Sequence, residues 1–245
     1  MSLCLSIFCP NPFRTFSKKK YFFNRVLGGP FKGLLYIRES FCSGFLAKIF
    51  GTYELEIVKY IVLGCKDIDC VIDIGAAEGY YAVGLLFNNP KLRCIAFECD
   101  KSARDLLDRL AILNNVADRL ICFDKADCAS LQTVLSQNGR VFVVVDIEGG
   151  EFELIDPVKV PGLKEIEFIV EIHDWFFPEL NADSIFRDRF SFTHNIKVIN
   201  ARIPLYSDIS HYFWRLVAFL NRDIASKMLE ERPRIMRWFL FTLKI

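Results

Sequence analysis

Carboxylates and glycines cluster in the stretch VVVDIEGGEFELID, residues 143–156. Three valines, which suit a strand buried on both faces of a sheet, lead into Asp146, Glu148 and Glu151, with two glycines before the last acid. Acids at the end of a strand can bind a divalent cation, remove a proton from a substrate, or cap the helix that follows. Other features of the sequence are needed to distinguish these three roles.

Glu171 and His173 form a second group of such residues, at the end of the apolar stretch IVEIH. The tips of neighbouring parallel strands lie about 5 Å apart, so side chains from two tips can reach one substrate hydroxyl. An imidazole can exchange a proton near neutral pH. We therefore predict that His173 removes the proton, that Asp146 and Glu148 orient the hydroxyl, and that Glu171 lies at the same rim.

Each of these residues also has a purely structural interpretation. Glu148 and Glu151 could cap the helix that begins at Gly149, and capping is the preferred interpretation for Glu151. Glu171 could be buried and paired with a basic residue from the N-terminal part of the chain, and His173 could be a buried hydrogen-bonding residue. The contacts that these side chains make in the folded chain distinguish such structural roles from catalysis.

A glycine-rich turn follows the first predicted strand in the stretch DIGAAEG. The small residues Gly75, Ala77 and Gly79 let the backbone approach a ligand, and the start of the next helix presents N–H groups. The dinucleotide pattern G-x-G-x-x-G would need its third glycine where Tyr80 stands. The order acid–x–G–x–[GA]–x–G, which begins at Asp73, instead resembles motif I of class I S-adenosylmethionine (SAM)-dependent methyltransferases.

Acids also end the second and third predicted strands. Glu98 follows CIAF and precedes Cys99, and an acid about 20 residues after a glycine turn can accept both hydroxyls of a ribose. Asp124 or Asp127, in FDKAD, could accept from an adenine amino group or form a solvated turn. Ligands of such sheets lie outside the carboxyl ends of the strands, so three consecutive acidic strand ends suit one extended nucleoside.

Four stretches, VIDIGAAEGYYAVG, IAFECD, VVVDIEGGEFELID and FIVEIHDW, together resemble the FkbM-type family of class I SAM-dependent methyltransferases in order and spacing. The resemblance covers about residues 50–180, and D-x-E-G-x-E at Asp146 to Glu151 is its most diagnostic part. The chain departs from the commoner family version, which has Asn where Glu78 stands. The resemblance implies SAM as cofactor and O-methylation of a hydroxyl on a saccharide or glycan precursor.

Two sets of candidate residues follow. The candidate cofactor-binding residues are Asp73, Gly75, Ala77, Glu78, Gly79, Glu98, Cys99, Asp124, Asp127 and Asp146. The candidate catalytic residues are His173, Asp146, Glu148 and Glu171. We assign no metal ligand. Asp146, Glu148 and Glu171 could hold Mg²⁺ or Ca²⁺, but the further Asp and Asn ligands of metal-dependent catechol-type methyltransferases are not found.

Apolar runs alternate with helix-like stretches from residue 53 onward. The expected strands are residues 70–75, 93–98, 119–123, 141–147 and 166–173, followed by 196–200 and 237–245 as a hairpin-like finish. Residues 212–229 suggest a long apolar helix. Continuous apolar strands that alternate with helices indicate a parallel sheet covered on both faces. We predict an α/β chain with a single Rossmann-like class I methyltransferase fold, built on a mainly parallel seven-stranded sheet with helices on both faces.

Residues 1–50 differ in composition from the rest and are predicted to form an N-terminal arm or cap, with residues 51–245 as the methyltransferase domain. The arm mixes basic and aromatic residues, including the cluster KKKYFF at residues 18–23. Such a cluster is most often a solvated face, and contact with a membrane surface is the alternative. We expect the arm and residues 212–229 to face the acceptor, because the residues predicted to bind the nucleoside lie between positions 73 and 128.

The overall composition limits the partners. Among 245 residues, 52% are hydrophobic and 24 are Phe, an excess that suits a deep apolar pocket, an oligomer interface or a membrane surface. The net charge of +1 gives no global field for nucleic acid, so none is expected as a partner. Nine scattered cysteines without C-x-x-C indicate a reducing compartment, which predicts a cytoplasmic location. No apolar run has the length of a transmembrane helix.

Other functions stay open at this point. A catalytically degenerate SAM-binding partner protein would hold the cofactor without transferring a methyl group. A metal-dependent O-methyltransferase of a small catechol-like acceptor would use the acids as ligands. An NAD-linked oxidoreductase is disfavoured by Tyr80 and Asp73. The acceptor, whether a small molecule or a glycan, and the oligomeric state do not follow from the sequence.

Overall fold

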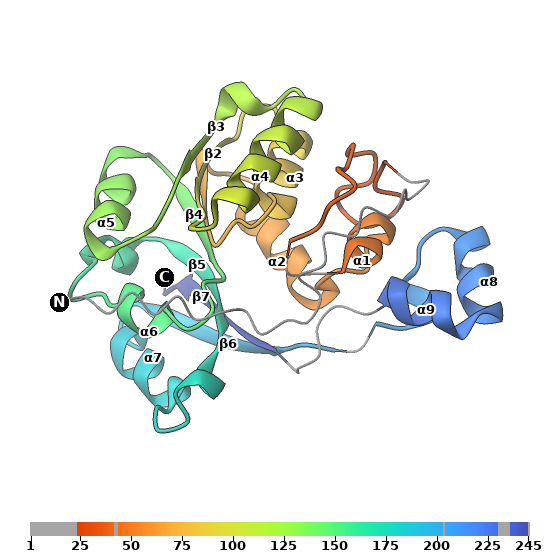
Figure 1. Cartoon of the computed structure of the whole chain (residues 1–245). Coiled ribbons are helices and arrows are strands. Elements are labelled where there is room, and N and C mark those ends of the chain that lie inside the picture. Colours follow the sequence, from red (N-terminus) through yellow and green to blue (C-terminus); the bar gives the residue numbers. More distant parts are fainter. Residues whose placement is uncertain (1–23, 42–43, 203, 230–235, 245) are drawn as a thin grey trace.

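The computed structural model describes residues 24–41, 44–202, 204–229 and 236–244, and it contains one seven-stranded sheet in the order β3-β2-β1-β4-β5-β7-β6 (Figure 1). The strands are β1 (Cys70–Ile74), β2 (Arg93–Phe97), β3 (Leu120–Phe123), β4 (Val141–Val145), β5 (Glu167–Ile172), β6 (His194–Asn200) and β7 (Arg237–Leu243). The first five strands pair in parallel, and β7 is antiparallel to both β5 and β6. The predicted Rossmann-like α/β architecture, with its mainly parallel seven-stranded sheet and hairpin-like finish, is confirmed.

Helices cover both faces of this sheet (Figure 1). They are α1 (Phe45–Phe50), α2 (Leu55–Gly64), α3 (Tyr80–Asn88), α4 (Lys101–Leu113), α5 (Cys128–Gln137), α6 (Glu151–Leu154), α7 (Ala182–Phe190), α8 (Tyr212–Leu220) and α9 (Arg222–Leu229). Helices α2, α3 and α4 pack on one face, and α5, α6 and α7 on the other. Helices α8 and α9 lie beyond α1 at one end of the molecule. None of the helices in the described part of the chain is long and apolar enough to cross a membrane.

The valine run that leads to Asp146 is buried on both faces of the sheet, as its composition predicted. Val143 and Val145 belong to the core beneath α5 and α7, whereas Val144 belongs to the core beneath α2 and α3. The edge strand β3 differs, because Ile121 and Phe123 are 56% and 46% exposed. Only one face of β3 is packed, because Leu120 and Cys122 contact the hydrophobic core beneath α4.

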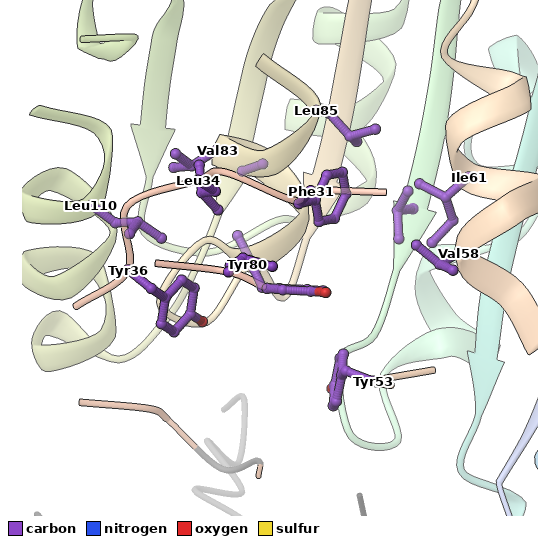
Figure 2. Packing of buried hydrophobic residues seen from close by; sticks show 14 of the residues in the cluster. Phe31, Leu34, Tyr36, Tyr53, Val58, Ile61, Tyr80, Val83, Leu85 and Leu110 are labelled. Atoms are coloured by element: carbon purple, nitrogen blue, oxygen red, sulfur yellow. The ribbon is translucent and has the colours of Figure 1, made fainter. Parts of the chain in front are cut away.

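The described part of the N-terminal arm packs onto α3. The Phe31 ring lies edge-on to Tyr80 at 5.1 Å between centroids, and a Cβ at Gly84 would come within 2.7 Å of that ring. Leu34 and Tyr36 follow it into the same core (Figure 2). Residues 26–41 and 44–50 therefore help to close one face of the sheet. The basic cluster at residues 18–23 lies outside the described residues, so its predicted solvent or membrane contact stays a prediction.

Two local details refine the predicted helices. Asp100 is the N-cap of α4, where its carboxylate accepts the backbone N–H groups of Ser102 and Ala103. The long helix expected over residues 212–229 is instead two helices, because the backbone at Asn221 is extended, with φ −136° and ψ 104°. This break lets α8 and α9 pack against each other.

Candidate active site

The turn after β1 is shaped first by its neighbouring strand. Gly75 has φ +87°, and a Cβ there would lie 1.7 Å from the carbonyl oxygen of Asp146. The N–H of Asp146 in turn donates to the carbonyl of Ile74 at 2.8 Å. The glycine was expected to make room for a ligand. The close approach of the β4 tip already requires it, and the same contact fixes Asp146 beside the turn.

Glu98 is attached to that turn through the backbone. Its Oε2 accepts the N–H of Ala77 and its Oε1 accepts the N–H of Asp100, both at 2.8 Å. Burial raises the pKa of the Glu98 carboxyl, while these two N–H groups favour its charged form. Ala77 has φ +47°, a strained value for a residue with a side chain. Cys99, the next residue, is exposed.

Asp73 lies beneath the turn at the end of β1. It is only 3% exposed, and burial together with the negative charge of Asp146 raises its pKa to about 7, against the opposing N–H of Ala82. Its Oδ2 has no hydrogen-bond partner among the described residues. Buried carboxylate oxygens usually have partners, so this oxygen marks a position where a ligand donor would be satisfied.

The two remaining acids expected at the nucleoside lie in the loop after β3. Asp127 is exposed and caps α5, since its Oδ1 accepts the N–H of Ser130 at 2.7 Å within a capping box. Asp124 is exposed and accepts the N–H of Lys125 at 2.8 Å. These contacts match the solvated-turn interpretation, and any adenine contact of either residue stays a prediction.

A buried histidine joins β5 to the end of β4. The His173 side chain is fully buried, and its Nδ1 lies 2.5 Å from Oε1 of Glu151, itself fully buried at the start of α6. The same oxygen accepts the N–H of Gly149 at 3.1 Å. No side chain of the described residues caps α6, so the predicted capping role of Glu151 is wrong, and its carboxylate holds the imidazole ring instead.

The other ring nitrogen faces the remaining acids. Nε2 of His173 lies 3.5 Å from Asp146 Oδ1, 3.6 Å from Glu148 Oε2 and 3.9 Å from Glu171 Oε2. The Glu171 side chain is 1% exposed, that of Asp146 23% and that of Glu148 49%. All four predicted catalytic residues thus converge, and the cluster opens to solvent on the Glu148 side.

Charge around the ring alters its titration. Burial lowers the pKa of His173, but the hydrogen bond to Glu151 and the charges of Asp146, Glu151 and Glu148 outweigh burial and raise it above its usual value. Glu148 has φ +52°, so the residue nearest to solvent is held in a strained backbone conformation.

The same cluster has the donor set of a cation site. Asp146, Glu171 and His173 each offer one ligand atom, and these atoms all lie within 4.8 Å of one another. Hard oxygen atoms and one imidazole suit several divalent ions. The geometry therefore supports both proton transfer and metal binding.

Sequence reasoning missed a second buried group, at Glu78. Its Oε1 accepts from Tyr36 Oη at 2.7 Å, Ser40 Oγ at 2.8 Å and Lys48 Nζ at 2.5 Å. The N-terminal segment was expected on the acceptor side, but these three residues reach the predicted cofactor turn. The available signal was a lone lysine within the apolar run FLAKIF.

Other titratable residues have structural roles. His194 is buried, with Nε2 2.8 Å from the carbonyl of Ile166 and Nδ1 2.8 Å from Thr193 Oγ1. Burial lowers its pKa. The six described cysteines are free thiols, in keeping with the absence of a C-x-x-C pattern.

Comparison with known proteins gives similarity in fold alone. No family model matches the chain, and no curated protein matches it. Similar solved structures include an O-methyltransferase from Bacillus cereus with SAH (TM-score 0.46, 11% identity, 75% of this chain and 80% of that one). Another is the O-methyltransferase TomG from Streptomyces achromogenes with SAM, with a TM-score of 0.46 and 12% identity over 75% of this chain and 78% of that one. A third is TrmN from Thermus thermophilus, with a TM-score of 0.48 and 11% identity over 76% of this chain and 48% of that one. The chain spans about half the length of TrmN.

Proposed function

We propose that this chain is a SAM-dependent methyltransferase that methylates a hydroxyl group. The observation that carries the proposal is the placement of His173 among Asp146, Glu148 and Glu171, directly beside the turn at Gly75 that follows β1. A nucleoside cofactor over the first turn would bring its reactive end to this cluster, since ligands of such sheets lie across the strand ends.

The chemistry asked of the residues is positioning and proton removal. SAM, when bound, supplies an activated methyl group, so aligning the acceptor with it is the main task. Nδ1–H of His173 donates to Glu151, which leaves the Nε2 lone pair to accept the proton of the acceptor hydroxyl. Asp146 and Glu148 accept from neighbouring hydroxyls and hold the acceptor. The new bond joins the hydroxyl oxygen to the methyl carbon as the bond from sulfur to that carbon breaks.

The acceptor class is a saccharide or glycan precursor, as the FkbM-type motifs imply. The carboxylates of Asp146 and Glu148, whose side chains are 23% and 49% exposed, suit hydroxyl donors. Trp175 lies against the His173 ring at 4.9 Å between centroids, and Phe176 at 6.3 Å. Both aromatic rings are partly exposed, so they can cover the apolar face of a sugar ring. A cytoplasmic location remains part of this proposal.

A metal-dependent O-methyltransferase is the second candidate, favoured by the ligand atoms of Asp146, Glu171 and His173. In that case His173 would be a ligand and could not serve as the base. EDTA would then abolish activity, and Mg²⁺, Mn²⁺ or Ca²⁺ would restore it. Activity that is insensitive to EDTA would remove this candidate.

The test of the proposed function combines binding with turnover. Calorimetry with SAM, against NAD as a control, checks the cofactor. A screen of nucleotide sugars, oligosaccharides and small phenols, with formation of S-adenosylhomocysteine (SAH) as readout, checks the transfer. SAM binding without turnover on any acceptor would favour the non-catalytic partner protein, and NAD binding without SAM binding would contradict the proposal.

A further inference from the structure

Lys48 and Glu78 form a buried ion pair at the cofactor turn. The side chains are 3% and 0% exposed, and Lys48 Nζ lies 2.5 Å from Glu78 Oε1. Lys48 comes from α1, whereas Glu78 lies in the turn between β1 and α3. Burial raises the pKa of the Glu78 carboxyl, but the charge and hydrogen bond of Lys48, with the hydroxyl of Tyr36, lower it overall. The carboxylate is therefore ionised.

This pair has unused hydrogen-bonding capacity on both sides. All three donors to Glu78 meet Oε1, and Oε2 has no partner among the described residues, although it is buried. An ammonium group has three N–H donors, and in the described part of the chain the hydrogen bond of Lys48 Nζ goes to Glu78 alone. One spare carboxylate oxygen thus lies beside spare ammonium protons.

We propose that Lys48 and Glu78 bind the amino-acid end of SAM, with the α-ammonium on Glu78 Oε2 and the α-carboxylate on Lys48 Nζ. The proposal rests on the proposed function and extends it to the N-terminal segment. An α-amino acid presents one cation and one anion on the same carbon, which is the complement of a fixed Lys–Glu pair. Both new contacts are charge-assisted hydrogen bonds, the stronger class.

The position along the chain fits this orientation. Ala77 and Glu78 are consecutive, and the N–H of Ala77 holds Glu98, the acid assigned to the ribose. One side of the turn thereby carries the acid for the nucleoside, and the next residue carries the pair for the amino acid. Tyr36 and Ser40, which donate to Oε1, are positioning residues, because they hold the carboxylate so that Oε2 stays available.

The test compares two ligands that differ only in the amino-acid end. SAH carries it, whereas 5′-methylthioadenosine keeps the adenosine and thioether and lacks it. We expect wild-type protein to bind SAH more tightly than methylthioadenosine. Lys48→Met should weaken SAH binding roughly 10- to 100-fold, as for the loss of a charged hydrogen bond, and leave methylthioadenosine binding unchanged. Lys59→Met, at an exposed lysine of α2, is the matched control and should change neither.

Folding of the variant is followed by thermal unfolding in the same samples. If Lys48→Met does not fold, because Glu78 is left buried beside no cation, the double variant Lys48→Met/Glu78→Gln removes both charges and should fold. It should bind both ligands with similar affinity. Equal weakening of both ligands in either variant would mean that the pair only fastens the N-terminal segment, and would overturn the proposal.

The outcomes also separate this inference from the function on which it rests. Equal affinity of wild-type protein for SAH and methylthioadenosine would overturn the Lys48–Glu78 assignment while leaving SAM-dependent methyl transfer intact. Failure of wild-type protein to bind SAM, SAH or methylthioadenosine would contradict the proposed cofactor itself, and the assignment would fall with it.

Discussion

Glu78 and Glu151 are two fully buried carboxylates just beyond strand ends, and they differ in the cation that each one meets. Glu78 pairs with Lys48 and Glu151 with His173, both at 2.5 Å. A lysine normally keeps its charge at neutral pH, whereas a histidine can gain or lose its proton there. A fixed pair suits binding of a charged ligand, and a titratable pair suits proton transfer. Under the proposed function, the Lys48–Glu78 pair would hold the cofactor and the Glu151–His173 pair would activate the acceptor.

The two regions also differ in access. The Lys48–Glu78 pair is closed to solvent, while the His173 cluster opens through Glu148, whose side chain is 49% exposed. Glu148 is also in a strained backbone conformation, with φ +52°. Strain of this kind persists where the surrounding structure holds it, and it commonly marks functional sites. This opening would let an acceptor reach the His173 ring from solvent.

The largest effect is expected at the titratable pair. His173→Asn removes the proton acceptor and should lower turnover by roughly two to four powers of ten, with SAM affinity retained. Methyl transfer and calorimetry on the same preparation measure the two effects. His211→Asn, at an exposed histidine, is the matched control and should keep full activity. Loss of activity in EDTA that Mg²⁺, Mn²⁺ or Ca²⁺ restores would instead make His173 a metal ligand. Full activity in His173→Asn would contradict both roles.

The next largest effect is expected on the cofactor side. Glu98→Ala removes the charged acceptor assigned to the ribose and should weaken SAM binding by about 1.5–3 kcal/mol. Turnover at saturating SAM should change much less. Glu98→Gln retains one oxygen acceptor, so its affinity for SAM should lie between those of wild-type protein and Glu98→Ala. Unchanged SAM affinity in Glu98→Ala would discard this placement of the cofactor.

The pH dependence should distinguish the two pairs. Because the pKa of His173 is raised, the neutral base should form only above its usual value of about 6.5, so turnover should rise with pH through that raised pKa. SAM binding should follow a different curve, set by Asp73 at the predicted cofactor turn, whose pKa is raised to about 7. Glu151→Gln removes one of the charges that raise the pKa of His173, while those of Asp146 and Glu148 remain. The acidic limb of turnover should therefore move to lower pH, although turnover itself should fall.

Stability should follow the opposite sense from turnover. A histidine with a raised folded-state pKa stabilises the fold fully below its unfolded pKa and loses that contribution as the pH rises through the folded value. The free energy of unfolding should therefore fall across the window in which turnover rises, and it should do so less in His173→Asn. Denaturant unfolding at several pH values measures it. Identical pH curves for the two proteins would contradict the raised pKa.

The fold and the convergence of Asp146 with His173 were predictable from sequence because both depend on short-range patterns. The valines of β4 alternate between two cores, and Asp146 and His173 follow directly on adjacent strands, so their proximity follows from sheet geometry. The partnership of Glu78 with Lys48 was not predictable, because 30 residues and no regular pairing separate them. The role of Glu151 was misjudged because helix capping explained it locally, and its contact with His173 is long-range.

The smallest expected effect concerns an acid that belongs to neither pair. Asp127 was considered for the adenine amino group, but it caps α5 in a capping box with Ser130. Asp127→Ala should therefore lower the free energy of unfolding by about 1 kcal/mol, whereas Asp127→Asn should lower it by much less, because Asn caps helices nearly as well. SAM affinity should be the same in both variants as in wild-type protein. Weaker SAM binding in Asp127→Ala with unchanged stability would instead make Asp127 a cofactor residue, and would extend the binding side of the molecule to the third strand end.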